Sequence, residues 1–255
     1  MGGSDAQECR DHRRCGRDRR RHRDRAQPRR LRPDDRWAPR RSLAEAADTI
    51  AREGGGPTVA THAADLAEPD AAAAVIDGHV ARFAGIDALV AGAGAYEPVP
   101  LLEVTAQSWD ATLHVHLRGA VLSASAAARH MTRAGYGRIV LISSVNGFHA
   151  EPATVAYSAA KAAIISVTRS LAIELAQHGV TANAVAPGWV RTPMTAAYLA
   201  EAGPDQLRLV NPLGRAGRAD EIARVIRFLV IDAPDFLTGA TIAVDGGQTA
   251  MAPMP

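Results

Sequence analysis

Long apolar runs, cysteine and lysine are all scarce in this chain of 255 residues. No stretch approaches the roughly 18 to 20 consecutive apolar residues that a membrane-spanning helix needs, and the N-terminus is charged where a signal peptide would be apolar. We therefore expect a cytoplasmic protein with no membrane partner. The only cysteines, Cys9 and Cys15, match no metal or redox spacing, so no role is assigned to them.

The charge of the chain changes sign near residue 42. Residues 1–41 hold 15 arginines against seven acidic residues, whereas residues 42–255 hold 13 arginines and one lysine against 20 acidic residues. An Arg-rich segment with few apolar residues is usually disordered, and it can serve as a basic arm for nucleic acid or acidic surfaces. We expect one folded domain over 42–255, preceded by a segment 1–41 of a different kind.

From Ser42 onward, helical periodicity alternates with short β-rich runs, which is typical of βαβ units around a parallel sheet. Right-handed crossovers predict an α/β fold, a Rossmann-like doubly wound parallel sheet in three α/β/α layers, with ligands at the carboxyl ends of the strands. The predicted strands are Thr58–His62, Ala88–Ala91, Arg138–Ser143, Thr181–Ala186 and Thr241–Val244. The predicted helices are Leu43–Arg52, Asp70–Phe83, Ala106–Thr132, Val155–Gln177 and Asp220–Leu229.

The beginning of such a fold has no counterpart in the sequence. A doubly wound dinucleotide-binding sheet starts with a strand, a glycine-rich turn and a helix whose N-terminal amides hold the pyrophosphate. Residues 9–41 contain neither an apolar strand nor a glycine-rich loop. The first strand and the glycine loop are therefore missing or scrambled.

Ser143 ends a predicted apolar strand, and Tyr157 and Lys161 lie four residues apart on one face of a predicted helix. A nearby ammonium favours a phenolate and lowers the pKa of a phenol, which fits a proton-transferring Tyr157 with Ser143 holding the substrate oxygen. An isolated Tyr-x-x-x-Lys pair is more often a surface feature of an amphipathic helix. Lys161 is however the only lysine beside 28 arginines, and a guanidinium would not suit a compact hydrogen-bonding role.

Ser143, Tyr157 and Lys161 stand in the catalytic order and spacing of the short-chain dehydrogenases/reductases, and residues 42–250 resemble that family. The resemblance implies hydride transfer between NAD or NADP and a small alcohol or carbonyl substrate. Tyr157 would act as acid/base, Lys161 would lower its pKa and anchor ribose, and Ser143 would position the substrate oxygen. The segment Leu237–Gly247 resembles a region through which many members form tetramers, which implies a homotetramer or homodimer.

Further residues match positions that contact the cofactor in the family. Asp65 would meet the adenine ring, with a turn or helix cap as the alternative. Val190 and Thr192 would contact the nicotinamide carboxamide, although the Pro-Gly before them could simply form a turn. The expected cofactor-binding residues are Asp65, Leu66, Ala91, Gly92, Ala93, Tyr157, Lys161, Pro187, Gly188, Val190 and Thr192.

Two positions depart from the family's pattern. Ala91–Gly94 replaces an Asn-Asn-Ala-Gly stretch and loses the amides that brace the cofactor loop. His116 replaces an Asn thought to support a proton-relay water near the lysine, so it is either an altered relay residue in the catalytic set or a core histidine. His114 and His116 point to different sides of a helix and lack a carboxylate or cysteine partner, so no metal site is expected.

A one-base shift of the reading frame would account for the segment that does not match. Arginine is almost the sole basic residue, as expected from a GC-rich gene, and GC-rich DNA read out of frame yields mostly Arg, Ala, Gly and Pro. Shifted by one base, the codons of Cys9–Arg20 permit Ala-Val-Ile-Thr-Gly-Ala-Ala-Gly-Gly-Ile-Gly, a strand followed by the family's cofactor loop. If the chain exists as written, cofactor affinity should collapse and the sheet should have an unpaired edge.

The sequence leaves the substrate open, because the expected substrate lid, Thr192–Leu213, is of variable character. The choice between NAD and NADP, and with it the reaction direction, is also open, because the end of the second strand and the glycine loop that decide it lie in the scrambled region. The rival function is a catalytically impaired oligomeric scaffold whose basic N-terminal arm binds nucleic acid or acidic partners. A weaker rival is a cofactor-free hydrolase or lyase that uses Ser143, although no nucleophile-elbow sequence accompanies it.

Overall fold

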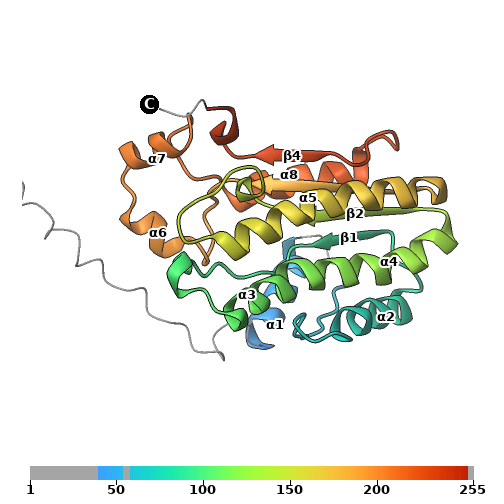
Figure 1. Cartoon of the computed structure of the whole chain (residues 1–255). Helices are drawn as coiled ribbons and strands as arrows, with labels where there is room; N and C mark the ends of the chain where they lie inside the picture. The colour runs from blue at the N-terminus through green and yellow to red at the C-terminus, as the bar shows by residue number, and fades with distance from the viewer. Residues whose placement is uncertain (1–39, 54–57, 252–255) are drawn as a thin grey trace, which may run out of the picture. The chain divides into compact units, whose positions relative to one another are not determined.

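The computed structural model describes residues 40–53 and 58–251, which Figure 1 draws in colour. The expectations that concern residues 1–39 lie outside the described residues. They are the basic arm, the shifted reading frame and the two cysteines, Cys9 and Cys15.

Four parallel strands form the sheet: β1 (Ala88–Ala91), β2 (Gly137–Ile142), β3 (Val180–Pro187) and β4 (Thr241–Val244). Their order in space is their order in the chain, and every neighbouring pair is parallel. Parallel neighbours need crossover connections, which the helices supply. The four strands predicted from Ala88 onward are confirmed to within one residue at each end.

Helices occupy much of the remaining described chain (Figure 1). In chain order they are α1 (Arg40–Glu53), α2 (Ala71–Phe83), α3 (Ala106–Leu113), α4 (Ala120–Ala134), α5 (Val155–Leu175), α6 (Ala196–Glu201), α7 (Pro204–Val210) and α8 (Ala219–Arg227). The segment expected to be the substrate lid therefore contains two short helices, α6 and α7. Neither was predicted from the sequence.

Successive residues of β2 enter two different apolar layers. Ile139 and Leu141 belong to a core cluster with Ile164 of α5 and with residues of α2 and α4, whereas Val140 belongs to a second cluster with Ile222 of α8. Figure 1 shows α4 and α5 in front of the strands and α8 behind them. Because side chains alternate along a strand, both faces of the sheet are covered. The predicted three-layer α/β/α, Rossmann-like fold is confirmed.

β1 is the outer strand of the described sheet, and β2 is its only ladder partner there. The strand predicted at Thr58–His62 is wrong, because these residues form no ladder. A strand needs a neighbour, and in a doubly wound sheet that neighbour comes from the N-terminal part of the sequence, where no strand pattern is found. Val90, which pairs with Val140 and shares its face, is accordingly 45% exposed. The described strands thus form one half of a doubly wound sheet.

The helix predicted as continuous over Ala106–Thr132 is interrupted by a π turn. α3 ends at Leu113, the π turn covers His114–Gly119, and α4 follows and ends before Gly135, which has a left-handed φ of 70°. A π turn inside a helix is rare and frequently lies at a functional site. This one contains His116, the histidine that the sequence singles out.

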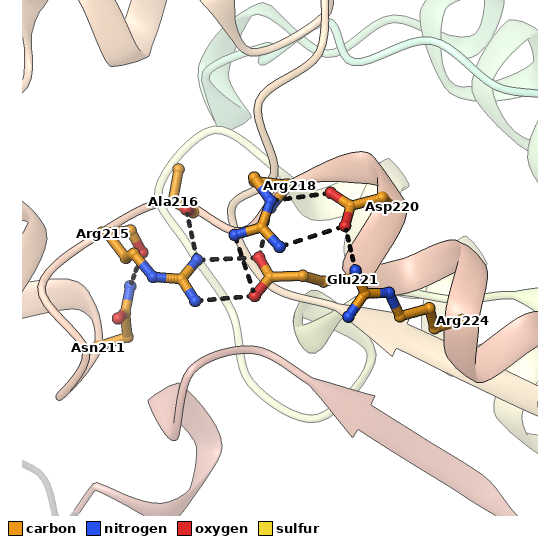
Figure 2. Close-up of polar contacts among 7 residues, drawn as sticks. All are labelled: Asn211, Arg215, Ala216, Arg218, Asp220, Glu221 and Arg224. Atoms are coloured by element: carbon orange, nitrogen blue, oxygen red, sulfur yellow. Dashed lines mark hydrogen bonds and ion pairs between the residues drawn. The ribbon is translucent and has the colours of Figure 1, made fainter.

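A network of ion pairs fixes the start of α8 (Figure 2). Arg215 contacts both carboxylate oxygens of Glu221 at 2.9 and 2.8 Å, and Glu221 also accepts a hydrogen bond from the Arg218 N–H at 2.8 Å. Arg218 contacts Asp220 at 2.9 and 3.2 Å, and Asp220 also pairs with Arg224 at 3.1 Å. The two acidic side chains complement the positive end of the helix dipole. Together these contacts hold the loop after α7 against the first turn of α8.

Candidate active site

The carboxyl ends of three strands and the start of α5 come together at one edge of the sheet. Gly92 follows β1, Ser143 and Ser144 follow β2, and Gly188 follows β3. Parallel neighbouring strands end at the same edge, so residues far apart in the sequence become neighbours there. Tyr157 reaches this edge from the first turn of α5.

Tyr157 and Lys161 occupy successive turns on one face of α5, as their spacing predicts. The Lys161 Nζ lies 5.6 Å from the centre of the Tyr157 ring and donates a hydrogen bond to the Ile142 carbonyl oxygen at 2.9 Å. Lys161 is 5% exposed. A buried ammonium is therefore held behind the tyrosine, at the end of β2.

Burial changes the acidity of both groups. It lowers the pKa of Lys161 to about 8, because a poorly solvated site disfavours the charged ammonium. Burial is also the largest influence on Tyr157 and raises the pKa of its phenol; a hydrogen bond with Ser144 lowers that pKa, and the Glu151 carboxylate raises it. The influence that lowers the Tyr157 pKa is the Ser144 hydrogen bond. Lys161, to which the sequence assigns this role, has the lower pKa of the two groups and loses its proton before the phenol does. The net raised pKa keeps the phenol protonated at neutral pH.

The two serines after β2 face different partners. Ser143 is 2% exposed, and its Oγ donates to the backbone carbonyl of Lys161 at 2.8 Å. The Ser144 side chain hydrogen-bonds with Tyr157, and its Oγ also accepts from the Asn146 N–H at 3.2 Å. In the structure, the hydroxyl that meets the tyrosine is that of Ser144, one position after the Ser143 that the sequence predicts, and the role of either serine toward substrate stays a prediction. Consecutive side chains in extended backbone point to opposite sides of the chain. Ser143 and Ser144 therefore face different surroundings although they are adjacent in the sequence.

His116 stands beside Tyr157 in the interior. It is 4% exposed, and its Nε2 lies 2.6 Å from the Ala95 carbonyl oxygen, a contact that places the proton on Nε2. The Ala95 N–H approaches the same nitrogen at 3.2 Å, but the shorter contact decides the tautomer. Burial, and after it the charge of Lys161, lowers the pKa of His116 to about 4. In the described structure its Nδ1 is buried with no hydrogen-bond partner. His116 is thus a buried, neutral residue whose Nδ1 can still accept a hydrogen bond.

Asp65 and Leu66 lie in the loop before α2. One carboxylate oxygen of Asp65 accepts from the Ala67 N–H at 2.8 Å, which is the turn-capping arrangement considered as the alternative. Leu66 lies against the π turn, since a Cβ added to Gly119 would be 3.0 Å from the Leu66 Cβ. Contact of Asp65 with an adenine ring stays a prediction.

The segment after β3 approaches the end of β4 closely. A Cβ on Gly188 would lie 2.9 Å from the Asp245 Cα, so glycine is required there. The Val190 side chain is 9% exposed and belongs to the core on the α8 side of the sheet. The Thr192 N–H donates to Thr195 Oγ1 at 3.2 Å, which orders the entry to α6. Contacts of Val190 and Thr192 with a carboxamide stay predictions.

Aromatic side chains gather at the site, although they make up 4% of the chain. The Tyr96 ring meets Tyr157 at 5.2 Å and Trp189 at 6.2 Å between centres, nearly perpendicular in both cases. Trp189 stacks on Tyr198 of α6 at 4.1 Å and 14°. Tyr96, Trp189 and Tyr198 were missed because they lie in separate segments with no shared spacing. Because aromatic residues are scarce in the chain, each one could have been considered a candidate site residue.

The site fits the nicotinamide and ribose part of a dinucleotide. Lys161 has three N–H donors, of which one is bonded to the Ile142 carbonyl oxygen. Gly92 and Ala93, which lie where β1 ends, are exposed. The adenine end has a weaker fit in the described residues, since the Asp65 carboxylate caps its own loop. Residues 1–39, where the glycine turn for the pyrophosphate is expected, lie outside the described residues.

Comparison with known proteins agrees with this geometry. Residues 38–249 match the family described as enoyl-(acyl carrier protein) reductase. Cis-4-hydroxycyclohexanecarboxylate dehydrogenase of Sinomonas cyclohexanicum is 40% identical over 212 residues, which cover 82% of this chain and 85% of that protein. The 3-oxoacyl-[acyl-carrier-protein] reductase of Synechocystis is 39% identical over 207 residues, or 80% of this chain and 82% of that one. The crystal structure of a gluconate 5-dehydrogenase from Burkholderia cenocepacia in complex with NADP and tartrate gives a TM-score of 0.74 at 36% identity, covering 82% of each chain.

The fold and these relatives define an oxidoreductase that uses NAD or NADP. The chain belongs to the short-chain dehydrogenase/reductase family. No helix in the described part of the chain combines the length and apolarity needed to cross a membrane. Within residues 40–53 and 58–251, no group of three or more His, Cys, Asp or Glu side chains could hold a metal ion.

Proposed function

We propose that this enzyme transfers a hydride between nicotinamide and an alcohol or carbonyl substrate, with Ser144, Tyr157 and Lys161 as the working groups. The observation that carries the proposal is the convergence of two hydroxyls and one buried ammonium at the end of β2. Ser144 hydrogen-bonds with Tyr157, and Lys161 lies behind the tyrosine ring. Ser144 takes the role that sequence spacing gives to Ser143.

Tyr157 is the proton donor in the reducing direction. Because its pKa is raised by burial, its O–H stays protonated and can donate to a carbonyl oxygen as negative charge develops there. Bound NAD(P)H supplies the hydride. In the oxidising direction Tyr157 takes the proton back from the alcohol.

Ser144 and Lys161 stabilise the tyrosine after it has lost its proton. The Asn146 N–H occupies a lone pair of Ser144 Oγ at 3.2 Å and leaves the Ser144 hydroxyl hydrogen available to the substrate oxygen or the phenolate. With a pKa of about 8, Lys161 is mostly charged at pH 7 and favours the phenolate. Its remaining N–H donors would hold the nicotinamide ribose.

His116 is the proposed positioning residue of the proton relay. Its bare Nδ1 can accept a hydrogen bond from a water that also contacts Lys161, whose charge already acts on the imidazole. Such a water would return a proton to Tyr157 from solvent by way of Lys161. The neutral imidazole suits this role, because it accepts a hydrogen bond without adding charge.

The remaining parts of the proposal concern cofactor contacts, assembly and location. Cofactor contacts are proposed for Asp65, Leu66, Ala91, Gly92, Ala93, Pro187, Gly188, Val190 and Thr192. We propose a cytoplasmic homotetramer or homodimer, because fully exposed apolar side chains such as Leu102 and Phe236 offer surface to bury between copies. The catalytic domain over 42–255 is proposed to be separate from segment 1–41, whose sequence a shifted reading frame would explain.

A fluorescence titration of the full chain with NADH and NADPH tests the proposal. Assays of alcohol oxidation and ketone reduction follow, with Tyr157→Phe as the matched variant. We expect the two proteins to bind cofactor equally, and only weakly if residues 1–41 are as written, with a kcat at least about 100-fold lower in Tyr157→Phe. Full activity of Tyr157→Phe would contradict the mechanism. Absence of cofactor binding together with salt-sensitive DNA affinity would favour the oligomeric scaffold with a basic arm.

A further inference from the structure

The Glu151 carboxylate lies in the active site but has no part in the proton transfer described above. The Tyr96 hydroxyl and the Asn146 Nδ2 both donate to its Oε2, each at 3.4 Å. Its charge raises the pKa of Tyr96 and of Tyr157, with burial as the larger cause for both phenols. Glu151 is therefore close enough to act electrostatically on the hydroxyl that meets the substrate.

The loop that carries Glu151 is held firmly. The Thr154 Oγ1 donates to the Glu151 carbonyl at 2.7 Å, and the Val99 N–H donates to the Ala153 carbonyl at 2.7 Å, which joins this loop to the segment that carries Tyr96. Ala153 has a left-handed φ of 64°, a conformation that non-glycine residues keep only where their surroundings impose it. The carboxylate is thus positioned before any substrate binds.

The charge of Glu151 is not balanced by a cation within the described structure. Both donors to its Oε2 are neutral, and in residues 40–53 and 58–251 its Oε1 takes part in no hydrogen bond or ion pair. Lys161, the ammonium of the site, directs its Nζ to the Ile142 carbonyl instead. A carboxylate without a cationic partner among the described residues therefore acts on the Tyr157 hydroxyl.

Next to this carboxylate lies a continuous aromatic wall. Tyr96 links the ring of Tyr157 to that of Trp189, and Trp189 stacks on Tyr198. Aromatic rings favour flat or alicyclic apolar partners, and their faces attract cations while repelling anions. The aromatic rings and the Glu151 carboxylate therefore both favour cationic or neutral ligands over anionic ones.

From this juxtaposition we infer that the site selects neutral or cationic, ring-containing alcohols and ketones over those that carry a carboxylate, with Glu151 as the specificity-determining residue. The inference rests on the proposed oxidoreductase function of the same site. Two like charges about 10 Å apart at an effective dielectric constant of roughly 20 repel enough to change affinity about tenfold. We expect a preference of that size for a neutral substrate over its anionic counterpart.

A matched pair of substrates on one carbon skeleton tests the inference. The probes are 4-hydroxycyclohexanecarboxylate and its primary amide, which differ in charge and hardly in shape. Their ratio of kcat/KM is measured with NAD and NADP for the wild type, Glu151→Gln and the control Glu174→Gln, which removes an exposed carboxylate farther along α5. A binding titration that follows the fluorescence of Trp189 provides a readout that needs no turnover. Its signal should be lost in Trp189→Phe and kept in Trp109→Phe.

The expected result is a ratio of about ten in favour of the amide in the wild type and in Glu174→Gln, which falls toward one in Glu151→Gln. A wild-type preference for the carboxylate would overturn the inference, and so would a ratio that Glu151→Gln leaves unchanged. If neither probe is turned over with either cofactor, this skeleton is not a substrate, and the proposed function is then decided by the cofactor titration and the Tyr157→Phe assays described above. The binding titration then still decides whether Glu151 sets the charge preference.

Discussion

The imidazole of His116 meets the ring of Tyr157 edge-on, with 5.1 Å between ring centres and 86° between ring planes. The two side chains come from different helical segments, and both are largely removed from solvent. The histidine therefore cannot change its charge without cost to the folded state. That cost has a predictable pH dependence.

Acid should destabilise the protein through His116. Its pKa in the folded chain is about 4, below the ordinary 6.5, so the unfolded chain takes up the proton first as the pH falls. The stability contributed by the neutral imidazole is thus present above about pH 6.5 and is lost by about pH 4, a change of roughly 3 kcal/mol. Urea denaturation of the wild type and His116→Asn at pH 7 and pH 4.5 measures it. An equal loss in both proteins would contradict the prediction.

The two serines after β2 should differ in their effect on activity. Ser144→Ala removes a hydroxyl that contacts Tyr157 and accepts the Asn146 N–H, and we expect kcat/KM to fall about 100-fold together with a loss of about 1 kcal/mol of stability. Ser143→Ala removes only a hydrogen bond to the Lys161 carbonyl, so it should keep most activity and lose about 1 kcal/mol of stability. Steady-state kinetics and thermal unfolding of both variants measure the two effects. The reverse pattern would restore Ser143 as the catalytic serine.

Gly94 should tolerate no side chain. A Cβ there would lie 2.3 Å from the His116 Cε1, so Gly94→Ala must displace the imidazole from its place beside Tyr157. Overpacking of this kind typically costs about 1 to 3 kcal/mol, and we expect kcat to fall as well. Gly85→Ala is the matched control, because a Cβ at Gly85 would meet nothing within 4 Å. Similar unfolding midpoints and rates for the two variants would show that the close approach is unimportant.

Glu221 should stabilise the start of α8 in a pH-dependent way. The Arg215 hydrogen bonds and the Arg218 N–H lower its pKa from 4.5 to about 2. Its contribution is therefore complete above about pH 4.5 and disappears as the pH falls toward 2. Glu221→Gln should lower the Tm at pH 7, and the gap to the wild type should narrow at pH 2.5. Because the carboxylate is exposed, the effect at pH 7 should be small.

Much of the fold follows from patterns that the chain carries within single segments. The run Arg138–Ser143 is apolar enough to predict β2, and the four-residue spacing of Tyr157 and Lys161 places both on one face of α5. Thr58–His62 has the composition of a strand but forms none in the described structure. Strand composition describes one partner of a ladder, and the other partner lies elsewhere in the chain.

The site was less accessible from sequence than the fold. The choice between Ser143 and Ser144 depends on which way the chain turns after β2, and no periodicity reports that. Tyr96 and Trp189 lie in irregular segments and meet only through the arrangement of strands. Local patterns predict which elements form, whereas contacts between loops follow from tertiary packing alone.

The π turn over His114–Gly119 also restricts how this gene can vary. A π turn accommodates one residue more than the α-helical ladder around it, so loss of one codon within the turn would let the helix become regular. The segments on either side would keep their orientation, because the turn takes up the extra residue locally, but the residues within the turn would move. His116 would leave the neighbourhood of Tyr157, and a fully helical, well-folded descendant would have lost its histidine from the catalytic centre. Homologous enzymes that differ in length at this helix should therefore differ in how they return the proton, even where every other catalytic side chain is identical.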